Sequence, residues 1–490
     1  MKKYILAIDQ GTTSSRAIIF DKKGRLLFSA QREVPCLFPK AGWVEADPLT
    51  IWVSVTDVIN EVLIKSNISL EQIATVGLTN QRETTVVWSK KTGLPVYNAI
   101  VWQSRQSSHI CDRFMDKKDL IQEKTGLRIN PYFSFSKVRF ILDHLENGQQ
   151  RAESGELLFG TIDSWIIYKM TLGKVHATDV SNASRTMLFN IKTMEWDEEL
   201  CALFNIPMQM LPKVYPSAYD YGELAYLKSD LRISGVLGDQ QAALFGQNCF
   251  EIGESKNTYG TGCFLLVNIG NNPVLSKKGL LTTVAWQIGD IVTYALEGSV
   301  FIGGAVVQWL RDEMELIKRS DEAESVALQS PSGGIYIVPA FAGLGTPYWD
   351  DDVHGAVFGL TRSSNRSQFV RASLEAIAYQ CKDVVEVIKK EIKKPLKSLK
   401  VDGGATVNRY LMQFQSDILQ TEIKLPRCLE TTALGVAYMA GLSCGFYPSL
   451  ESIKQIHEYQ AIYEPHKSQN EVDELYKGWK RAIKATRIFK

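Results

Sequence analysis

Three apolar segments of this chain each end in an aspartate with glycine close by, and this pattern constrains the fold more than any other feature. The segments lie at residues 5–16, 236–245 and 399–408. Each predicts a buried strand that delivers a carboxylate to a tight turn. One such aspartate is often only a turn or helix-cap residue. Three of them favour a fold in which several strand ends meet at one site.

The residues around these aspartates suit the transfer of a phosphoryl group. Residues 12–14 are small and hydroxylic, so they leave backbone N–H groups uncovered, as a phosphate cradle requires. Asp9 can hold a metal ion while Asp239 faces it from the second segment. The glycine pair at residues 403–404 lets a nucleotide approach the backbone, and the helix predicted after it favours an anion. None of the three segments is a Walker phosphate loop.

Length and composition exclude several classes of protein. A chain of 490 residues exceeds one ordinary core and suggests roughly two to four domains. A net charge of +1 gives no field that would recruit nucleic acid or an acidic membrane. No apolar run approaches the ~20 residues that span a bilayer, and the N-terminus does not read as a signal peptide. The eight scattered cysteines are typical of reduced thiols. We therefore expect a cytoplasmic protein with no membrane span.

Strand and helix patterns alternate in both halves of the chain. Predicted strands lie at residues 4–8, 15–21, 26–32, 73–78, 256–261, 264–267 and 290–296. Predicted helices lie at residues 48–65, 301–317, 368–392, 408–414 and 472–488, the last of them packed on the surface.

This alternation predicts two α/β domains with a cleft between them. We place the boundary near residues 248–256, giving domains at residues 1–250 and 251–490. Ligands of such sheets bind at the carboxyl ends of strands. Four charged side chains fall at these ends: Asp9, Arg82, Asp239 and Asp402.

The motifs at residues 9–16, 79–84, 238–243 and 257–262 resemble those of the FGGY carbohydrate-kinase family. Further matching stretches lie at residues 343–349, 355–360, 371–375 and 402–405. The resemblance runs from Ile5 to about Gly441 and is strongest to the branch that phosphorylates glycerol. It implies an α/β fold of two duplicated ribonuclease H-like domains, of the actin, hexokinase and Hsp70 type, around a central cleft.

The resemblance implies ATP-dependent phosphorylation of glycerol to sn-glycerol 3-phosphate, the first step of glycerol catabolism, in a homodimer or homotetramer. ATP and Mg²⁺ are the implied cofactors, with Asp9 holding the metal and Asp239 acting as general base for in-line transfer. The implied polyol site comprises Arg82, Glu83, Trp102, Tyr132, Asp239, Gln240 and Phe264. The implied nucleotide site comprises Thr12, Thr13, Ser14, Arg16, Thr261, Gly304, Gln308, Gly404 and Asn408.

The residue types fit these implied roles. Arg82 and Glu83 supply adjacent opposite charges, which form stronger hydrogen bonds to hydroxyl groups than neutral side chains do. A surface ion pair is the alternative interpretation of these two residues, and their position at a strand end argues against it. Without the resemblance, Trp102 and Phe264 would be interpreted as core residues. Asp239 is ionised near neutral pH in its ordinary state, so it can accept a hydroxyl proton. Catalysis is expected to come mainly from positioning and charge neutralisation.

Two positions depart from the family pattern, and two other functions stay open. Ser104 stands where an acidic residue is common and Phe140 where tryptophan is common, and we expect both changes to be tolerated. The first alternative is a kinase for another polyol or sugar, such as xylulose or erythritol. Residues 80–83 argue against it, because they resemble the glycerol branch. The second is an actin- or Hsp70-like ATPase that controls a partner, which needs no polar polyol pocket.

Overall fold

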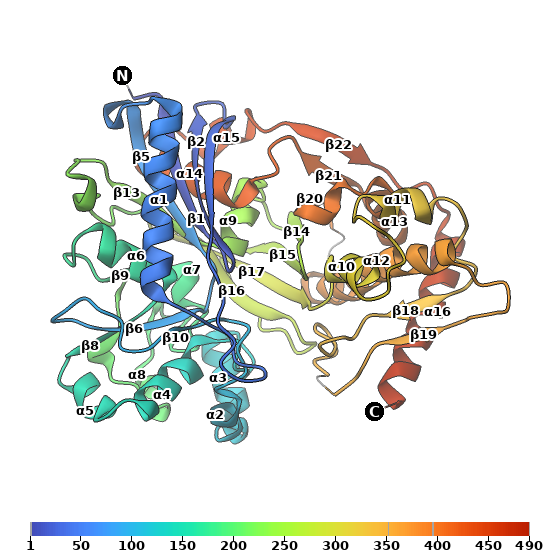
Figure 1. Ribbon diagram of the computed structural model, residues 1–490, viewed down its shortest axis with the longest axis horizontal. Coiled ribbons are helices and arrows are strands. Elements are labelled where there is room, and N and C mark those ends of the chain that lie inside the picture. The colour runs from blue at the N-terminus through green and yellow to red at the C-terminus, as the bar shows by residue number, and fades with distance from the viewer. Residues whose placement is uncertain (1, 351, 394–395, 490) are drawn as a thin grey trace.

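Two large mixed sheets lie side by side in the computed structural model, which describes residues 2–350, 352–393 and 396–489 (Figure 1). The first sheet has the strand order β13-β5-β1-β2-β3. An antiparallel meander forms one part of it, and β5 and β13 extend it in parallel on the other side of β1. Its strands are β1 (Tyr4–Gln10), β2 (Ser14–Asp21), β3 (Leu26–Glu33), β5 (Ile73–Asn80) and β13 (Ile233–Gly238).

The second sheet repeats this plan and carries one extra strand at each edge. Its order is β16-β17-β15-β14-β20-β21-β22. The strands β14, β15 and β17 form the antiparallel meander, and β20 and β21 continue in parallel beyond β14. The bounds are β14 (Ser255–Tyr259), β15 (Cys263–Gly270), β16 (Leu281–Ile288), β17 (Ile291–Val300), β20 (Leu399–Asp402), β21 (Ile423–Pro426) and β22 (Tyr459–Tyr463). The expected duplicated α/β architecture is therefore confirmed.

The strands that lead to Asp9 and Asp239 both belong to the first sheet, and neither belongs to the second. The strands β1 and β13 flank β5, and both run parallel to it. Gln10, Asn80 and Gly238 lie level across these strands. Since the carboxyl ends of parallel strands meet at one sheet edge, the fold brings Asp9, Asp239 and the residues after Asn80 together there.

Two helices join the halves of the chain. The helix α9 (Asp239–Gly246) follows the last strand of the first sheet, and α14 (Thr431–Ser443) comes from the second half. The helices pack without side chains between them at one point, where a Cβ on Gly435 would lie 1.8 Å from the Ala242 carbonyl oxygen. The helix α14 also lies against the first sheet, since a Cβ on Gly77 would lie 2.5 Å from the Val436 carbonyl oxygen. Glycines at these positions therefore allow the close packing that fixes the two halves.

A smaller layer that the sequence patterns did not predict is formed mainly by the chain between β5 and β13, to which a short strand from before β5 is added. Its sheet has the order β4-β7-β6-β8. The strands are β4 (Glu45–Ala46), β6 (Thr85–Ser89), β7 (Ala99–Ile100) and β8 (Leu157–Thr161). The helices are α2 (Ser108–Asp112), α3 (Lys118–Thr125), α4 (Ser134–His144), α5 (Gly148–Glu153), α6 (Ile162–Met170), α7 (Val180–Ala183) and α8 (Glu198–Leu203). On α4, Phe140 is buried and meets the Trp43 ring edge-on with centroids 5.4 Å apart, so this position keeps an aromatic contact in the core.

Most predicted helices are present, and one was predicted too long. The helix predicted at residues 301–317 is only α10 (Ala305–Asp312), and before it the N–H groups of Gly303 and Gly304 bond to the carbonyls of Thr261 and Gly260 at 2.8 Å. The C-terminal helix α16 (Gln469–Ile488) is amphipathic and packs on the surface as expected, with Trp479 on its buried face. The other helices are α1 (Pro48–Ser66), α11 (Glu322–Ala327), α12 (Arg366–Ile392), α13 (Arg409–Leu419) and α15 (Leu450–Lys454).

Short strands complete the fold: β9 (Ala177–Asp179), β10 (Phe189–Asn190), β11 (Glu195–Trp196), β12 (Lys213–Tyr215), β18 (Tyr336–Val338) and β19 (Ala356–Phe358). Within the described ranges, every helix is too short or too polar to cross a membrane.

Candidate active site

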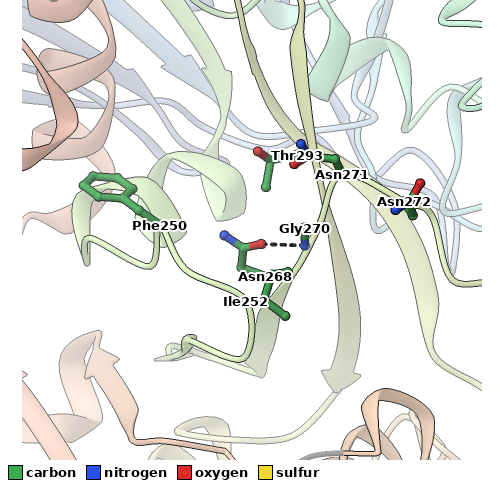
Figure 2. Close-up of a pocket in the computed structure, with 7 residues that line it drawn as sticks. All are labelled: Phe250, Ile252, Asn268, Gly270, Asn271, Asn272 and Thr293. Atoms are coloured by element: carbon green, nitrogen blue, oxygen red, sulfur yellow. Dashed lines mark hydrogen bonds between the residues drawn. The ribbon is translucent and has the colours of Figure 1, made fainter.

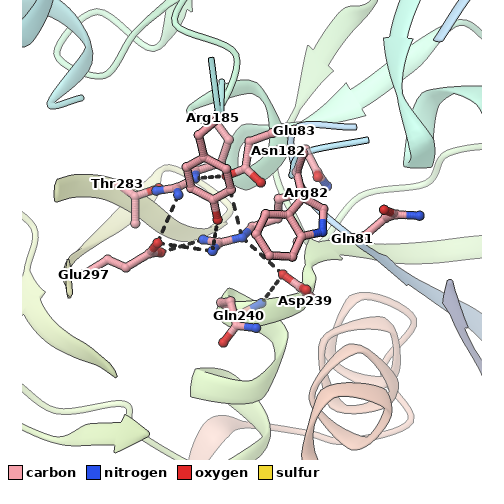
Figure 3. A network of polar contacts seen from close by, with 12 residues as sticks. Gln81, Arg82, Glu83, Asn182, Arg185, Asp239, Gln240, Thr283 and Glu297 are labelled. Carbon is pink, nitrogen blue, oxygen red and sulfur yellow. Dashed lines mark hydrogen bonds and ion pairs between the residues drawn. The ribbon is translucent and has the colours of Figure 1, made fainter. Parts of the chain in front are cut away.

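Asp239 stands at the first position of α9, where the first sheet meets the second (Figure 3). Its Oδ1 accepts the backbone N–H of Gln240 at 2.7 Å and lies 3.1 Å from Nε of Arg82. No hydrogen bond reaches its Oδ2 from any residue that the structure describes. The side chain is 30% exposed, whereas that of Arg82 is 2% exposed. One carboxylate oxygen of Asp239 is thus held by the protein and the other is available.

The guanidinium group of Arg82 is the centre of a buried polar network (Figure 3). Nη1 donates to Glu297 at 2.6 Å and to Gln241 at 3.2 Å, and Nη2 donates to Glu297 at 3.2 Å. The contact from Nη2 to the Tyr132 hydroxyl is 3.4 Å, the longest of the set. Gly238 leaves room for this side chain, because a Cβ there would lie 2.7 Å from Cγ of Arg82.

A second buried arginine closes the network into a ring of alternating charge. Nε of Arg185 donates to Glu83 at 2.5 Å, and its Nη2 donates to Glu297 at 3.0 Å. Burial alone would raise the pKa of Glu297, but Arg185 and Arg82 outweigh it and lower that pKa to about 2. For Glu83, burial dominates over both arginines, so its pKa is raised. Four charges removed from water are therefore compensated mainly by one another.

Glu83 itself has a backbone conformation that is uncommon for its type. Its φ is +61°, in the left-handed region that favours glycine. The hydroxyl groups of Ser134 and Thr85 both donate to its carbonyl oxygen at 3.1 Å. Such a conformation persists where the surroundings fix it, and it commonly marks a functional site.

The three aromatic rings of the predicted polyol site lie next to one another. The Trp102 ring meets those of Tyr132 and Phe264 edge-on, with centroids 5.5 Å and 6.2 Å away. Nε1 of Trp102 donates to the Thr12 hydroxyl at 2.9 Å, which ties this wall to the turn between β1 and β2. Phe264 comes from β15 of the second sheet, so both halves of the chain contribute to the wall.

Asp9 and Arg16 face each other across the β1–β2 hairpin. They are register partners, and Nη1 of Arg16 pairs with Glu430 at 2.7 Å. Burial raises the pKa of Asp9 to about 7; Arg16 opposes this change, while Asp239 and Glu430 add to it. Asp9 and Asp239 are therefore close enough to repel each other. Nowhere in the described residues do three or more His, Cys, Asp or Glu side chains gather as a metal cage.

Glycine-rich turns from three segments converge on the side of the second sheet. A Cβ on Gly304 would lie 2.7 Å from the Gly260 carbonyl oxygen and 3.8 Å from Cβ of Ala405. Gly403 has a φ of +93°, and a Cβ there would lie 2.6 Å from the Tyr259 carbonyl oxygen. The backbone at Gly304 therefore packs directly on that at Gly260, and the backbone at Gly403 packs on that at Tyr259, with no room for a side chain. Beside them, Gly404 is exposed, and a Cβ there would meet no atom within 4 Å.

The other predicted nucleotide residues lie at hairpin tips and on helices, and in the described part of the chain none of them bonds to the buried network around Arg82. Thr13 and Thr261 are exposed at the tips of the hairpins β1–β2 and β14–β15, and Ser14 is the first residue of β2. Gln308 is exposed on α10. Asn408 caps α13, since its Oδ1 accepts the backbone N–H of Leu411 at 2.9 Å. For Asn408, a structural role is thus visible in the fold.

Four residues of the network were not predicted: Arg185, Gln241, Lys256 and Glu297. The signal for Glu297 was present, because a single carboxylate within the apolar strand β17 needs a buried partner. Lys256 likewise is a charge on a strand whose neighbouring residues are buried.

A cavity of about 300 Å³ lies elsewhere, at the far end of β15 from Phe264 (Figure 2). Phe250, Ile252, Asn268, Gly270, Asn271, Asn272 and Thr293 line it. None of these side chains is ionisable at neutral pH, and the cavity contains no nucleophile next to a base. This cavity therefore offers no acid–base or nucleophilic chemistry.

Comparisons with known proteins show which family the chain belongs to. The N-terminal domain profile of the FGGY family of carbohydrate kinases matches residues 4–246, and the C-terminal domain profile matches residues 255–444. A glycerol kinase of Bacillus licheniformis is 54% identical, with 100% of both chains covered. The crystal structure of Plasmodium falciparum glycerol kinase with ADP aligns at a TM-score of 0.93 and 35% identity, covering 99% of this chain and 98% of that one. A gluconate kinase of Lactobacillus acidophilus, with a TM-score of 0.89 and 23% identity over 100% of both chains, is alike in fold alone.

Proposed function

Because the chain belongs to the FGGY family of carbohydrate kinases, we propose that it transfers the γ-phosphoryl group of ATP to glycerol, forming sn-glycerol 3-phosphate and ADP. The observation that carries this proposal is the 54% identity to a glycerol kinase over the full length of both chains. The buried charged network at the strand ends adds support. Relatives named for other sugars are similar in fold only, so they do not support the alternative of another substrate.

The polyol site is formed by the ion network and the aromatic wall. A triol needs several convergent charged partners for its hydroxyl groups and an apolar surface for its carbon chain. Glu83 uses Oε1 for Arg185, so its other oxygen can accept from a hydroxyl. The long 3.4 Å contact from Arg82 to Tyr132 is the one that a polyol oxygen would replace. Trp102 and Phe264 supply the apolar surface.

Asp239 is the proposed general base, and Oδ2 is the oxygen that takes the hydroxyl proton. Its Oδ1 is held by Arg82 and by the Gln240 backbone, which fixes the orientation of the carboxylate. The hydroxyl oxygen then attacks the γ-phosphorus in line as the bond to the ADP oxygen breaks. Most of the rate enhancement comes from positioning and charge neutralisation, to which the base adds about 10²–10⁴-fold.

The residues on the hairpins fit Mg²⁺ and ATP. Asp9 offers an oxygen ligand whose raised pKa a bound cation would lower again. Mg²⁺ takes one or two carboxylates and completes its shell with water and phosphate oxygens, so no protein cage is needed. When bound, it would neutralise charge on the transferred phosphoryl group. The exposed glycine surface at Gly404 and the hairpin tips at Thr13 and Thr261 are the proposed contacts for ATP.

Measurement of ADP release tests this proposal. The purified protein is assayed with ATP and Mg²⁺ plus glycerol, xylulose, erythritol or no polyol. We expect turnover with glycerol to exceed the other three by at least tenfold. Equal ADP release without polyol would favour the ATPase alternative, and a preference for xylulose or erythritol would favour another sugar kinase. A cytoplasmic location and a homodimer or homotetramer remain predictions, which cell fractionation and light scattering can test.

A further inference from the structure

A buried lysine lies directly beneath the N-terminal end of α9, next to the proposed base. Lys256 on β14 is fully buried, and its Nζ donates to Oε1 of Gln240 and, at 2.8 Å, to the hydroxyl of Thr258. Gln240 is the residue after Asp239, and Thr258 precedes the hairpin tip that carries Thr261. Lys256 thus links the residue after Asp239 to the strand that leads to Thr261.

A second buried lysine shows what a purely structural lysine does in this sheet. Lys400 on β20 is the register partner of Lys256. Its Nζ donates to the Asn248 carbonyl oxygen at 2.9 Å, just beyond the C-terminal end of α9, and to Glu254 at 3.2 Å. The helix dipole favours a cation at that end and opposes one at the N-terminal end. Lys400 therefore suits stability, whereas the position of Lys256 works against it and requires another explanation.

The bond to Gln240 supplies that explanation. An ammonium group has only donors, so it must face the amide oxygen of Gln240. The amide NH₂ group then points elsewhere, and no described residue accepts from it. We propose that Lys256 is a positioning residue of the polyol site, which makes Gln240 a hydrogen-bond donor to a polyol hydroxyl oxygen. This inference rests on the proposed function and extends it, because it assigns Gln240 as the donor and the polyol oxygen as the acceptor of one hydrogen bond.

The orientation depends on the charge of Lys256. A neutral amine has a lone pair and could accept from the NH₂ group instead, so the preference would vanish on deprotonation. Burial lowers the pKa of Lys256 to about 8, and Arg82 acts in the same sense. Asp402 on β20, Asp239 on α9 and Glu297 on β17 oppose that change. The KM for glycerol of the unmodified protein should therefore rise above about pH 8.

A double-mutant cycle with Lys256→Met and Gln240→Ala tests the proposal. Each single variant should raise the KM for glycerol by about 3- to 10-fold, the value of one hydrogen bond. The double variant should match Gln240→Ala alone, because the lysine acts only through the amide. The KM for ATP should stay within about twofold. Lys400→Met is the matched control and should leave the KM for glycerol unchanged.

Three results would overturn the inference. The first is multiplication of the two effects in the double variant, which would show that Lys256 acts independently of Gln240. The second is a fall in kcat with an unchanged KM for glycerol, which would place Lys256 in phosphoryl transfer. The third is a KM for glycerol that does not change between pH 7 and 9.5. This measurement uses the unmodified protein, so it tests the inference even if Lys256→Met does not fold. If the unmodified protein has no glycerol-dependent turnover, the proposed function fails and this inference fails with it.

Discussion

Replacement of Glu297 by glutamine should destabilise the protein more than any single surface change. Glu297 is fully buried and holds Arg82 at 2.6 Å and Arg185 at 3.0 Å. Its pKa of about 2, against an ordinary 4.5, corresponds to about 3 kcal/mol of stability above pH 4.5. Removal of one partner from a buried ion pair costs about 3–5 kcal/mol, because the other charge is left uncompensated. The two values agree, so Glu297→Gln should lose about 3–5 kcal/mol at pH 7.

Urea unfolding followed by tryptophan fluorescence at pH 7 measures this loss. The contribution is lost as the pH falls from 4.5 towards 2, because in this range the unfolded state takes up a proton that the folded state does not bind until about pH 2. Glu458→Gln is the matched control, since Glu458 pairs with Arg427 at 2.6 Å but is 63% exposed. An exposed pair contributes at most about 1 kcal/mol. A loss below about 1 kcal/mol for Glu297→Gln would refute the claim that Glu297 compensates the buried charges of Arg82 and Arg185.

Two further predictions concern the polyol and the metal. Arg82→Lys keeps the charge but loses the planar fork that serves Glu297 and Asp239 together. We expect kcat/KM for glycerol to fall at least 100-fold, about the loss from an unpaired buried polar group, while the KM for ATP changes little; equal losses in steady-state kinetics would contradict this. The pKa of Asp9, raised from 3.8 to about 7, makes folding less favourable as the pH rises through this range. Asp9→Asn should therefore abolish Mg²⁺-dependent turnover yet raise Tm at pH 8 without Mg²⁺, and an unchanged or lower Tm in a thermal melt would contradict this reasoning.

The strand ends were the part of the site that the sequence could predict. Apolar runs that stop at a charged residue gave the positions of Asp9, Arg82 and Asp239, and the parallel pairing of β1, β5 and β13 then accounts for their meeting. The duplicated order of strands also followed from alternating patterns in the two halves. These features are local or periodic, which is the information that one sequence carries most clearly.

The partners of these residues could not be predicted in the same way. Arg82 and Glu297 are 215 positions apart, and Arg185 and Glu83 are 102 apart. Nothing local to either member of a pair specifies such a contact. The smaller layer with the strand order β4-β7-β6-β8 was missed for a different reason, because β4 and β7 have only two residues each and show no periodicity. The helix α10 was predicted too long at its start, since the tertiary contacts of Gly303 and Gly304 replace its first turn.

Steady-state kinetics of Asp239→Asn, with ATP binding measured separately by calorimetry, tests the central claim most directly. The substitution keeps the shape of the side chain but removes the base at Oδ2. At saturating glycerol, kcat should fall by about 10²–10⁴-fold. The affinity for ATP should stay within about threefold, because the proposed nucleotide contacts lie on the hairpin tips and at Gly404 and not on Asp239. A near-normal kcat at saturating glycerol would contradict the account and leave positioning alone as the source of catalysis.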